Sequence, residues 1–327
     1  MVISVEKINQ PALYCPFPYK VNKYIDFLED DTFEWAKRFN ILANASYYQR
    51  FLKARFCLLS SSAYPSSELE ELKIATNWLI WTFFWDDQCD LSHLSERPEL
   101  LKTHNTRLLQ ILNGAESESD DIPLAYALSD LRSRFLQNSN TQWFHRFVQT
   151  VEHTFNAVEK QLTYQKEGTI PSVETYIKLR RSTSYVYTLI EIIEFCEQIT
   201  LPEEIHKHIM IQSLRRMANN ILSWTNDIFS VYKEIKVGDI YNIVILTQHE
   251  QKISFQEAIN YAVELCNQEV QEFIDLTERL PDFGKEMNAE VERYISGMRS
   301  WIRGHLDWYS STGHYQTAEM LTIPFTK

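Results

Sequence analysis

Glycine and proline are scarce in this chain, which has 7 glycines and 10 prolines in 327 residues. Average usage of glycine alone is about 7%. A β-sandwich or β-barrel needs many tight turns, where these two residues predominate. Their scarcity therefore disfavours such folds and favours long helices. The glycines form neither G-x-G-x-x-G nor a P-loop, so a glycine-rich phosphate-binding loop is excluded.

Apolar residues recur at spacings of three and four almost to the end of the chain, which is the periodicity of amphipathic helices. One predicted helix begins at Ser67, because Glu70 three residues later completes a capping box. Neither a linker nor a change in composition divides the sequence. We therefore expect one all-α domain over residues 1–327, with about ten helices and an extended N-terminal segment over residues 1–25.

The charge and cysteine content narrow the class of protein. The formal net charge is −12, and no cluster of lysine and arginine interrupts the acidic background, which disfavours nucleic acid and anionic membranes as partners. Five cysteines without a C-x-x-C pair fit reduced thiols, and so a cytoplasmic protein. The longest apolar stretch, residues 74–85, is shorter than the roughly 20 residues that span a bilayer.

Three carboxylates end the apolar stripe of one predicted helix. The stripe over residues 72–83 continues by three and then four residues to Asp86 and Asp90, with Asp87 beside them. Carboxylates crowded together on a buried face need a compensating cation. Oxygen ligands that leave part of the coordination shell open suit Mg²⁺. The alternative is a solvated acidic helix end.

A second oxygen-rich row is formed by Asn226, Ser230 and Glu234, which are spaced by four. Such residues drift only about 80° around a helix over two steps, so they share one face. An amide oxygen, a hydroxyl and a carboxylate in a row again suit Mg²⁺. Lys233 could reach a phosphate. The alternative is that Asn226 and Ser230 are merely tolerated within a helix.

The two motifs together, Asp86-Asp87-x-x-Asp90 and Asn226-Asp-x-x-Ser230-x-x-x-Glu234, resemble the paired signature of class I terpene synthases of microbial type, in particular bacterial sesquiterpene cyclases. The resemblance implies a helical bundle in which the motifs face each other across a central cavity. They would bind three Mg²⁺ ions and the diphosphate of a prenyl diphosphate. Residues 310–327 would then close over the site.

The same family carries a diphosphate-sensing arginine 46 residues before the asparagine of the second motif, and Arg180 occupies that position here. Thr183 and Ser184 fall at the family's linker and effector positions. Their hydroxyls weaken helix and favour a local break, where a free carbonyl would stabilise the first carbocation. Arg181 is the second candidate for the diphosphate contact, and the alternative is an ordinary surface arginine pair.

The chain departs from the family near its C-terminus. The family usually ends in Arg-Tyr, whereas this chain has His314-Tyr315, six residues after Trp308. Tyr315 keeps the expected diphosphate contact, and His314 supplies charge only when it is protonated. Arg303 either replaces the missing arginine or is a solvated helix position.

The chemistry implied by this resemblance separates two charges. Metal ions, Arg180 and Lys233 would hold the departing diphosphate, while an apolar, aromatic cavity would protect the carbocation from water. Phe83 and Trp308 are the predicted cavity walls, although most aromatic residues of the chain should belong to the core. No side chain stands out as a dedicated base, and the departing diphosphate is the proton acceptor that the family implies.

Farnesyl diphosphate is the substrate that the resemblance favours, with geranyl and geranylgeranyl diphosphate left open. A chain-elongating prenyl diphosphate synthase is the main alternative, but its second motif would be rich in aspartate. A non-catalytic helical scaffold is the other alternative. The sequence leaves open whether the protein is a monomer or a homodimer.

Overall fold

The structure is a computed structural model that describes residues 12–42, 45–91, 97–312 and 325–326, without the side chains of 45–47, 50, 87–91 and 325–326. The elements in chain order are β1 (Leu13–Tyr14), α1 (Ile25–Arg38), α2 (Ala45–Ala54), α3 (Phe56–Ala63), α4 (Leu69–Leu91), α5 (Pro98–Leu112), α6 (Pro123–Asn138), α7 (Thr141–Lys166), α8 (Val173–Thr183), α9 (Val186–Glu197), α10 (Glu203–Lys207), α11 (Ile209–Val237), α12 (Ile243–Gln251), α13 (Phe255–Thr277), α14 (Lys285–Ser311) and β2 (Phe325–Thr326).

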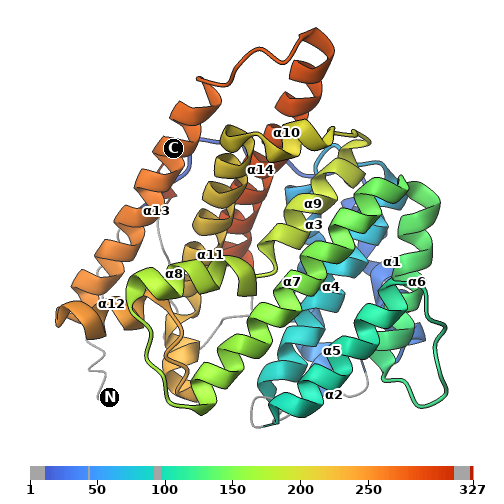
Figure 1. Ribbon diagram of the computed structural model, residues 1–327, viewed down its shortest axis with the longest axis horizontal. Helices are drawn as coiled ribbons and strands as arrows, with labels where there is room; N and C mark the ends of the chain where they lie inside the picture. The colour runs from blue at the N-terminus through green and yellow to red at the C-terminus, as the bar shows by residue number, and fades with distance from the viewer. Residues whose placement is uncertain (1–11, 43–44, 92–96, 313–324, 327) are drawn as a thin grey trace.

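The predicted helical bundle is confirmed, and α4 and α11 both run toward its lower end in Figure 1. More helices form than expected because left-handed residues divide long helical stretches. Arg55, with φ 52°, separates α2 from α3, and Tyr185, with φ 62°, separates α8 from α9. The capping box predicted at Ser67 is wrong, because its hydroxyl donates to the Glu68 carbonyl and α4 begins at Leu69.

The two ends of the described chain meet in a short parallel pair that the sequence did not predict. Leu13 lies opposite Phe325, and Tyr14 lies opposite Thr326. Asn267 of α13 fixes the first strand, because its Oδ1 accepts from the Tyr14 amide at 2.7 Å. The N-terminal segment is thereby attached to α13.

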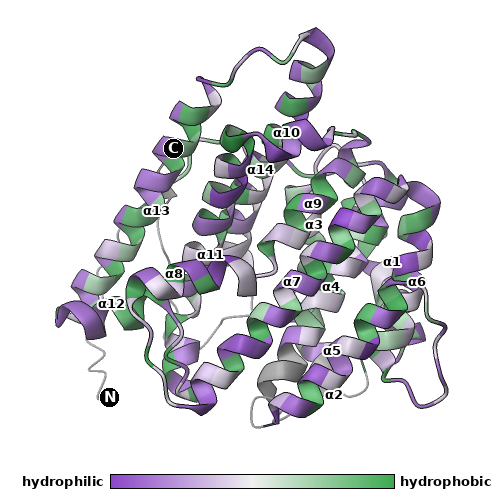
Figure 2. Cartoon of the chain, in the orientation of Figure 1, coloured by the Kyte–Doolittle hydropathy of each residue, from purple (hydrophilic) through white to green (hydrophobic). Residues whose placement is uncertain are grey.

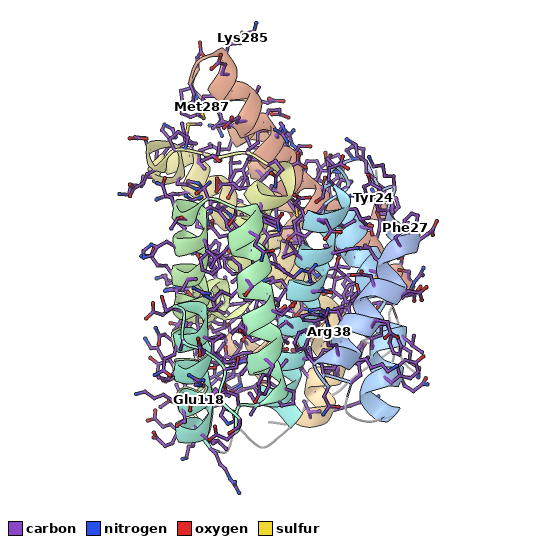
Figure 3. All side chains as sticks on the ribbon, turned by 90° about the vertical axis from the view of Figure 1, so that its right-hand side faces the viewer. Tyr24, Phe27, Arg38, Glu118, Lys285 and Met287 are labelled. Atoms are coloured by element: carbon purple, nitrogen blue, oxygen red, sulfur yellow. The ribbon has the colours of Figure 1, made fainter. Side chains whose placement is uncertain are left out.

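The core is one continuous cluster of buried apolar residues from Leu13 to Tyr309. Figure 2 shows apolar and polar residues alternating along α7 and α13, as expected of helices with one face on the core. Glu118 and Lys285 lie at opposite ends of the bundle in Figure 3. In the described part of the chain, no helix has both the length and the apolar character needed to cross a membrane.

Close packing fixes the position of α14 on α3. A Cβ atom at Gly304 would lie 2.7 Å from Cβ of Ser62 and 2.9 Å from its backbone carbonyl carbon. Since real atoms do not approach so closely, glycine is required for this contact. The residues that follow on α14 are therefore held at a fixed distance from the rest of the bundle.

Candidate active site

The oxygen row of α11 is continuous in the structure. Ser230 Oγ donates to Glu234 Oε1 at 2.6 Å. Asn226 lies one turn earlier, where its Oδ1 accepts from Arg180 Nη2 at 2.8 Å and its Nδ2 donates to the Tyr309 hydroxyl at 2.8 Å. Helices α8 and α14 therefore meet α11 at the first residue of the predicted motif.

Arg180, at the predicted diphosphate-sensing position, contacts the second motif. Its Nε donates to Asp227 Oδ1 at 3.0 Å. Burial lowers the pKa of the guanidinium, but the attraction of Asp227, Glu234 and Asp86 outweighs burial and raises the pKa overall. Asp86 of the first motif thus acts electrostatically on the arginine that contacts the second motif.

Asp227 is a buried carboxylate that accepts hydrogen bonds from neighbouring helices, a role that was not predicted from the sequence. It is 1% exposed, and its Oδ2 accepts from the Tyr176 hydroxyl at 2.6 Å and from the Ile243 amide at 3.0 Å. Asn242 Nδ2 donates to the Asp227 carbonyl and to Glu234 Oε2, both at 2.6 Å. The signal was present in the sequence, since Asp227 lies inside the motif and Asn242 belongs to the segment that follows it.

Two carboxyl groups in this part of α11 have raised pKa values. Burial, together with repulsion from Asp227 and Asp239, raises the pKa of Glu234 to about 8. Burial also raises the pKa of Asp227 in spite of the attraction of Arg180. Amide, hydroxyl and carboxylate oxygens in one row are ligands that a hard divalent cation prefers.

A metal site of three or more His, Cys, Asp or Glu is absent from the described residues. Two members of the α11 row are instead an asparagine and a serine. In the first motif, only the Asp86 side chain is described. It is exposed, so the expectation that it lies on a buried face is wrong. Asp87 and Asp90 lie in the last turns of α4, and their side chains are outside the described part. Their role as metal ligands stays a prediction.

The predicted break in the helix after Arg180 is confirmed. Ser184 ends α8, and Tyr185 is left-handed before α9 begins. Asn219 of α11 holds the break, because its Nδ2 donates to the Arg181 carbonyl at 2.9 Å and its Oδ1 accepts from Ser184 Oγ at 3.3 Å. Thr183 Oγ1 is buried and has no hydrogen-bond partner in the structure.

The end of α4 lies against this break. The Trp85 ring stacks on Phe155 at 5.0 Å and meets the Tyr185 ring edge-on at 5.2 Å. Trp85 immediately precedes Asp86. The structure therefore brings the first motif, the break and the second motif to the same end of the bundle.

The predicted aromatic walls, Phe83 and Trp308, are neighbours, with ring centroids 6.2 Å apart. Phe83 is half-buried, whereas Trp308 is 1% exposed and donates from Nε1 to the Ala54 carbonyl. Tyr309 was missed: its ring stacks on Phe229 at 4.1 Å, and its hydroxyl accepts from Asn226. Contact of Phe83 and Trp308 with substrate stays a prediction.

The remaining candidate cations differ in their partners. Arg181 Nε donates to Asn220 Oδ1 at 2.7 Å, so Arg180 is the arginine of this pair that contacts the second motif. Arg303 forms an ion pair with Asp307 and donates to a backbone carbonyl of the N-terminal segment. Its guanidinium is therefore already engaged in the substrate-free protein.

Three predicted diphosphate contacts have no described geometry to support them. Lys233 is half-buried beside Glu234 on α11. His314 and Tyr315 lie outside the described residues. Their roles stay predictions.

A hollow of about 410 Å³ lies away from these residues, between α1, α4 and α6. It is lined by charges of both signs and one tryptophan: Asp31, Glu34, Trp35, Arg38, Glu70, Lys73 and Arg134. Acidic and basic side chains pair across it, as Lys73 does with Asp31 at 3.2 Å. A lining of paired charges does not suit a carbocation.

Comparisons with known proteins agree with this geometry. Residues 77–272 match the family model described as terpene synthase family 2, C-terminal metal binding, a range that contains both motifs. The chain is 44% identical to germacrene A synthase of Nostoc punctiforme, over 96% of this chain and 97% of that protein. It is 34% identical to (+)-T-muurolol synthase of Roseiflexus castenholzii, over 93% of each.

Among solved structures, germacradien-4-ol synthase from Streptomyces citricolor superimposes with a TM-score of 0.82 at 28% identity, over 92% of this chain and 99% of that one. The family model covers more than half of the chain. The germacrene A synthase match extends over nearly the whole length of both proteins. The chain therefore belongs to the terpene synthase family.

Proposed function

We propose that this chain converts farnesyl diphosphate to a cyclic sesquiterpene hydrocarbon and diphosphate, with Mg²⁺ as its metal. The observation that carries the proposal is the contact of Arg180 with both Asn226 and Asp227, because it joins a diphosphate-binding cation to an oxygen row suited to metal ions. The 44% identity to a germacrene A synthase supports a hydrocarbon product.

Ionisation of the substrate requires stabilisation of the leaving diphosphate. Bound Mg²⁺ would supply positive charge to the diphosphate oxygens. Asn226, Ser230 and Glu234 would hold metal from α11, and Asp86, Asp87 and Asp90 from α4. Three ions are the number that the resemblance implies.

Arg180 can exchange partners without losing its position. Its Nη2 lies 2.8 Å from Asn226 Oδ1 and 3.0 Å from Asp227 Oδ1, and its Nε donates to the same Asp227 oxygen. Nη2 would turn its hydrogen bond with Asn226 toward a diphosphate oxygen, while the ion pair with Asp227 keeps the guanidinium in place. A planar guanidinium is suited to such multidentate contacts. Lys233, His314 and Tyr315 are the further candidates for diphosphate contact.

The hydrocarbon part of the substrate needs the opposite environment. The break at Ser184 and Tyr185 leaves backbone groups without helical partners next to the α4 and α11 motifs. Carbonyl oxygens there would stabilise the first carbocation. Aromatic side chains such as Phe83 exclude water and offer π faces to the cation.

The test uses purified protein with MgCl₂ and each of farnesyl, geranyl and geranylgeranyl diphosphate. Diphosphate release is followed, and volatile products are identified by gas chromatography with mass spectrometry. We expect a cyclic hydrocarbon from farnesyl diphosphate. Parallel reactions contain isopentenyl diphosphate. A longer prenyl diphosphate in these reactions would identify a chain-elongating enzyme, and no diphosphate release from any substrate would contradict an enzymatic role.

A further inference from the structure

His305 is a half-buried histidine of α14 to which the mechanism above gives no role. It lies one helical turn before Tyr309, and the two ring centroids are 4.7 Å apart. Because the Tyr309 hydroxyl contacts Asn226, Tyr309 marks the level of the metal motif. One turn of helix corresponds to roughly 6 Å along the axis. His305 therefore lies about one turn deeper in the bundle than the proposed diphosphate site.

His305 keeps some accessible surface on an otherwise closed face of α14. It is partly exposed, although its neighbours on the same face of α14 are all at most 2% exposed: Trp301, Ile302, Trp308 and Tyr309. On the other side, Gly304 is pressed against Ser62. The Arg180 guanidinium acts electrostatically on the imidazole. Through its contact with Tyr309, His305 lies near the level at which Arg180 and Asn226 meet.

The imidazole is kept neutral in this position. Burial, followed by repulsion from Arg180, lowers the pKa of His305 to about 3. Nδ1 is buried with no hydrogen-bond partner in the structure, and the ring lies nearly parallel to Trp308, with centroids 6.0 Å apart. A neutral imidazole does not repel a carbocation, and it still carries a nitrogen lone pair. It is far more basic than any alkene, aromatic ring or amide around it.

We propose that His305 is the catalytic base that ends the reaction by taking a proton from the final carbocation. The C–H bond next to the cationic carbon breaks, and its electron pair forms the new C=C bond. The proton forms an N–H bond at Nε2, while Nδ1 carries the other ring proton. The imidazolium then passes its proton to diphosphate or to water as the product leaves.

This inference rests on the proposed function, and it makes a separate prediction about product composition. Loss of the base does not prevent ionisation, because the diphosphate is held elsewhere. The cation would survive longer and lose a different proton, rearrange or capture water. The signature of the base is therefore a changed product mixture at a nearly unchanged rate of diphosphate release.

The experiment compares wild type with His305→Phe and His305→Asn, using farnesyl diphosphate and MgCl₂. Phenylalanine keeps an aromatic ring, and asparagine keeps polarity in a smaller side chain, so either variant suffices if the other does not fold. His145→Asn, at an exposed position on α7, is the matched control. Thermal melts establish that each protein is folded.

We expect both His305 variants to release diphosphate within about fivefold of the wild-type rate, while the share of the main hydrocarbon falls at least about fivefold. The control keeps the wild-type mixture. An unchanged mixture in a folded variant overturns the proposal, as does a loss of diphosphate release with the mixture preserved. If wild type itself releases no diphosphate from farnesyl diphosphate, the proposed function fails instead.

Discussion

Two buried charge clusters lie on neighbouring helices and differ in their balance. The site cluster, Asp227, Glu234 and Arg180, has two carboxylates for one guanidinium. The α9 cluster has two carboxylates and two guanidinium groups, with a histidine beside them: Glu191, Glu194, Arg146, Arg215 and His206. The same helix, α11, contributes Arg215 to one cluster and the metal motif to the other.

The carboxylates of the two clusters respond differently to burial. Glu191 and Glu194 are at most 2% exposed and are bound by Arg215 and Arg146, respectively. Burial alone would raise the pKa of Glu191, but Arg215 and its neighbours hold the pKa below its usual value. At the site the pKa of Glu234 is raised to about 8. The guanidinium groups thus favour the ionised form of Glu191, whereas burial and neighbouring carboxylates disfavour the ionised form of Glu234.

The largest expected effect is that of Glu234→Ala. It removes a proposed metal ligand, and turnover should fall by about 10²–10³-fold or more, as when one preorganised charge-stabilising group is lost. The stabilisation of wild type by MgCl₂ plus diphosphate should disappear.

Calorimetry and the diphosphate-release assay test both parts of this prediction. Glu264→Ala, at an exposed position on α13, is the matched control and should behave as wild type. Wild-type turnover in Glu234→Ala would remove the second motif from the mechanism.

Glu191→Gln should lower the stability of the fold and leave the reaction unchanged, the reverse of what is expected for Glu234→Ala. Removing one partner leaves Arg215 buried without its counter-charge, which typically costs about 3–5 kcal/mol of folding stability. The folded fraction should keep the wild-type product mixture. Denaturant titration measures the loss, and the double variant Glu191→Leu with Arg215→Met should recover most of it. If Glu191→Gln is as stable as wild type, the α9 cluster does not stabilise the fold.

The α9 cluster also predicts a pH dependence of stability. The pKa of Glu191 is lowered in the fold, so its ionisation stabilises the protein above the unfolded value of about 4.3. This contribution is lost as the pH falls through the folded pKa. The stability difference between wild type and Glu191→Gln should thus be constant above about pH 5 and shrink below about pH 4. Denaturant titrations from pH 3.5 to 7 measure it, and a constant difference throughout would contradict the assignment.

Local patterns predicted the parts of this molecule that depend on helical periodicity. The helical fold, the row from Asn226 to Glu234 and the break after Arg180 all follow from spacing and residue type along one helix. These features are local because neighbours three and four residues apart share a face before any tertiary contact forms. The choice of Arg180 over Arg181 came instead from the family resemblance.

The features that were missed depend on contacts between distant segments. Tyr309 contacts Asn226 across 83 residues, and Asn219 holds a carbonyl 38 residues away. The pairing of β1 with β2 joins opposite ends of the sequence. His305 is an unremarkable member of an amphipathic helix until tertiary packing surrounds it. The helix predicted after Ser67 does form, but its capping box does not, because the serine hydroxyl donates to the Glu68 carbonyl.

The smallest effect is expected for Tyr309→Phe, which removes one hydrogen bond to Asn226 of the second motif. The Tyr309 hydroxyl accepts from Asn226 Nδ2 and so points Oδ1 of that amide toward Arg180. Phenylalanine keeps the stack on Phe229 but removes the acceptor. One hydrogen bond of about 1 kcal/mol corresponds to roughly a fivefold change in an equilibrium constant. The Mg²⁺ concentration for half-maximal turnover should therefore rise about fivefold, with little change in the maximal rate. A large fall in the maximal rate at saturating Mg²⁺ would instead place the Tyr309 hydroxyl in the reaction itself.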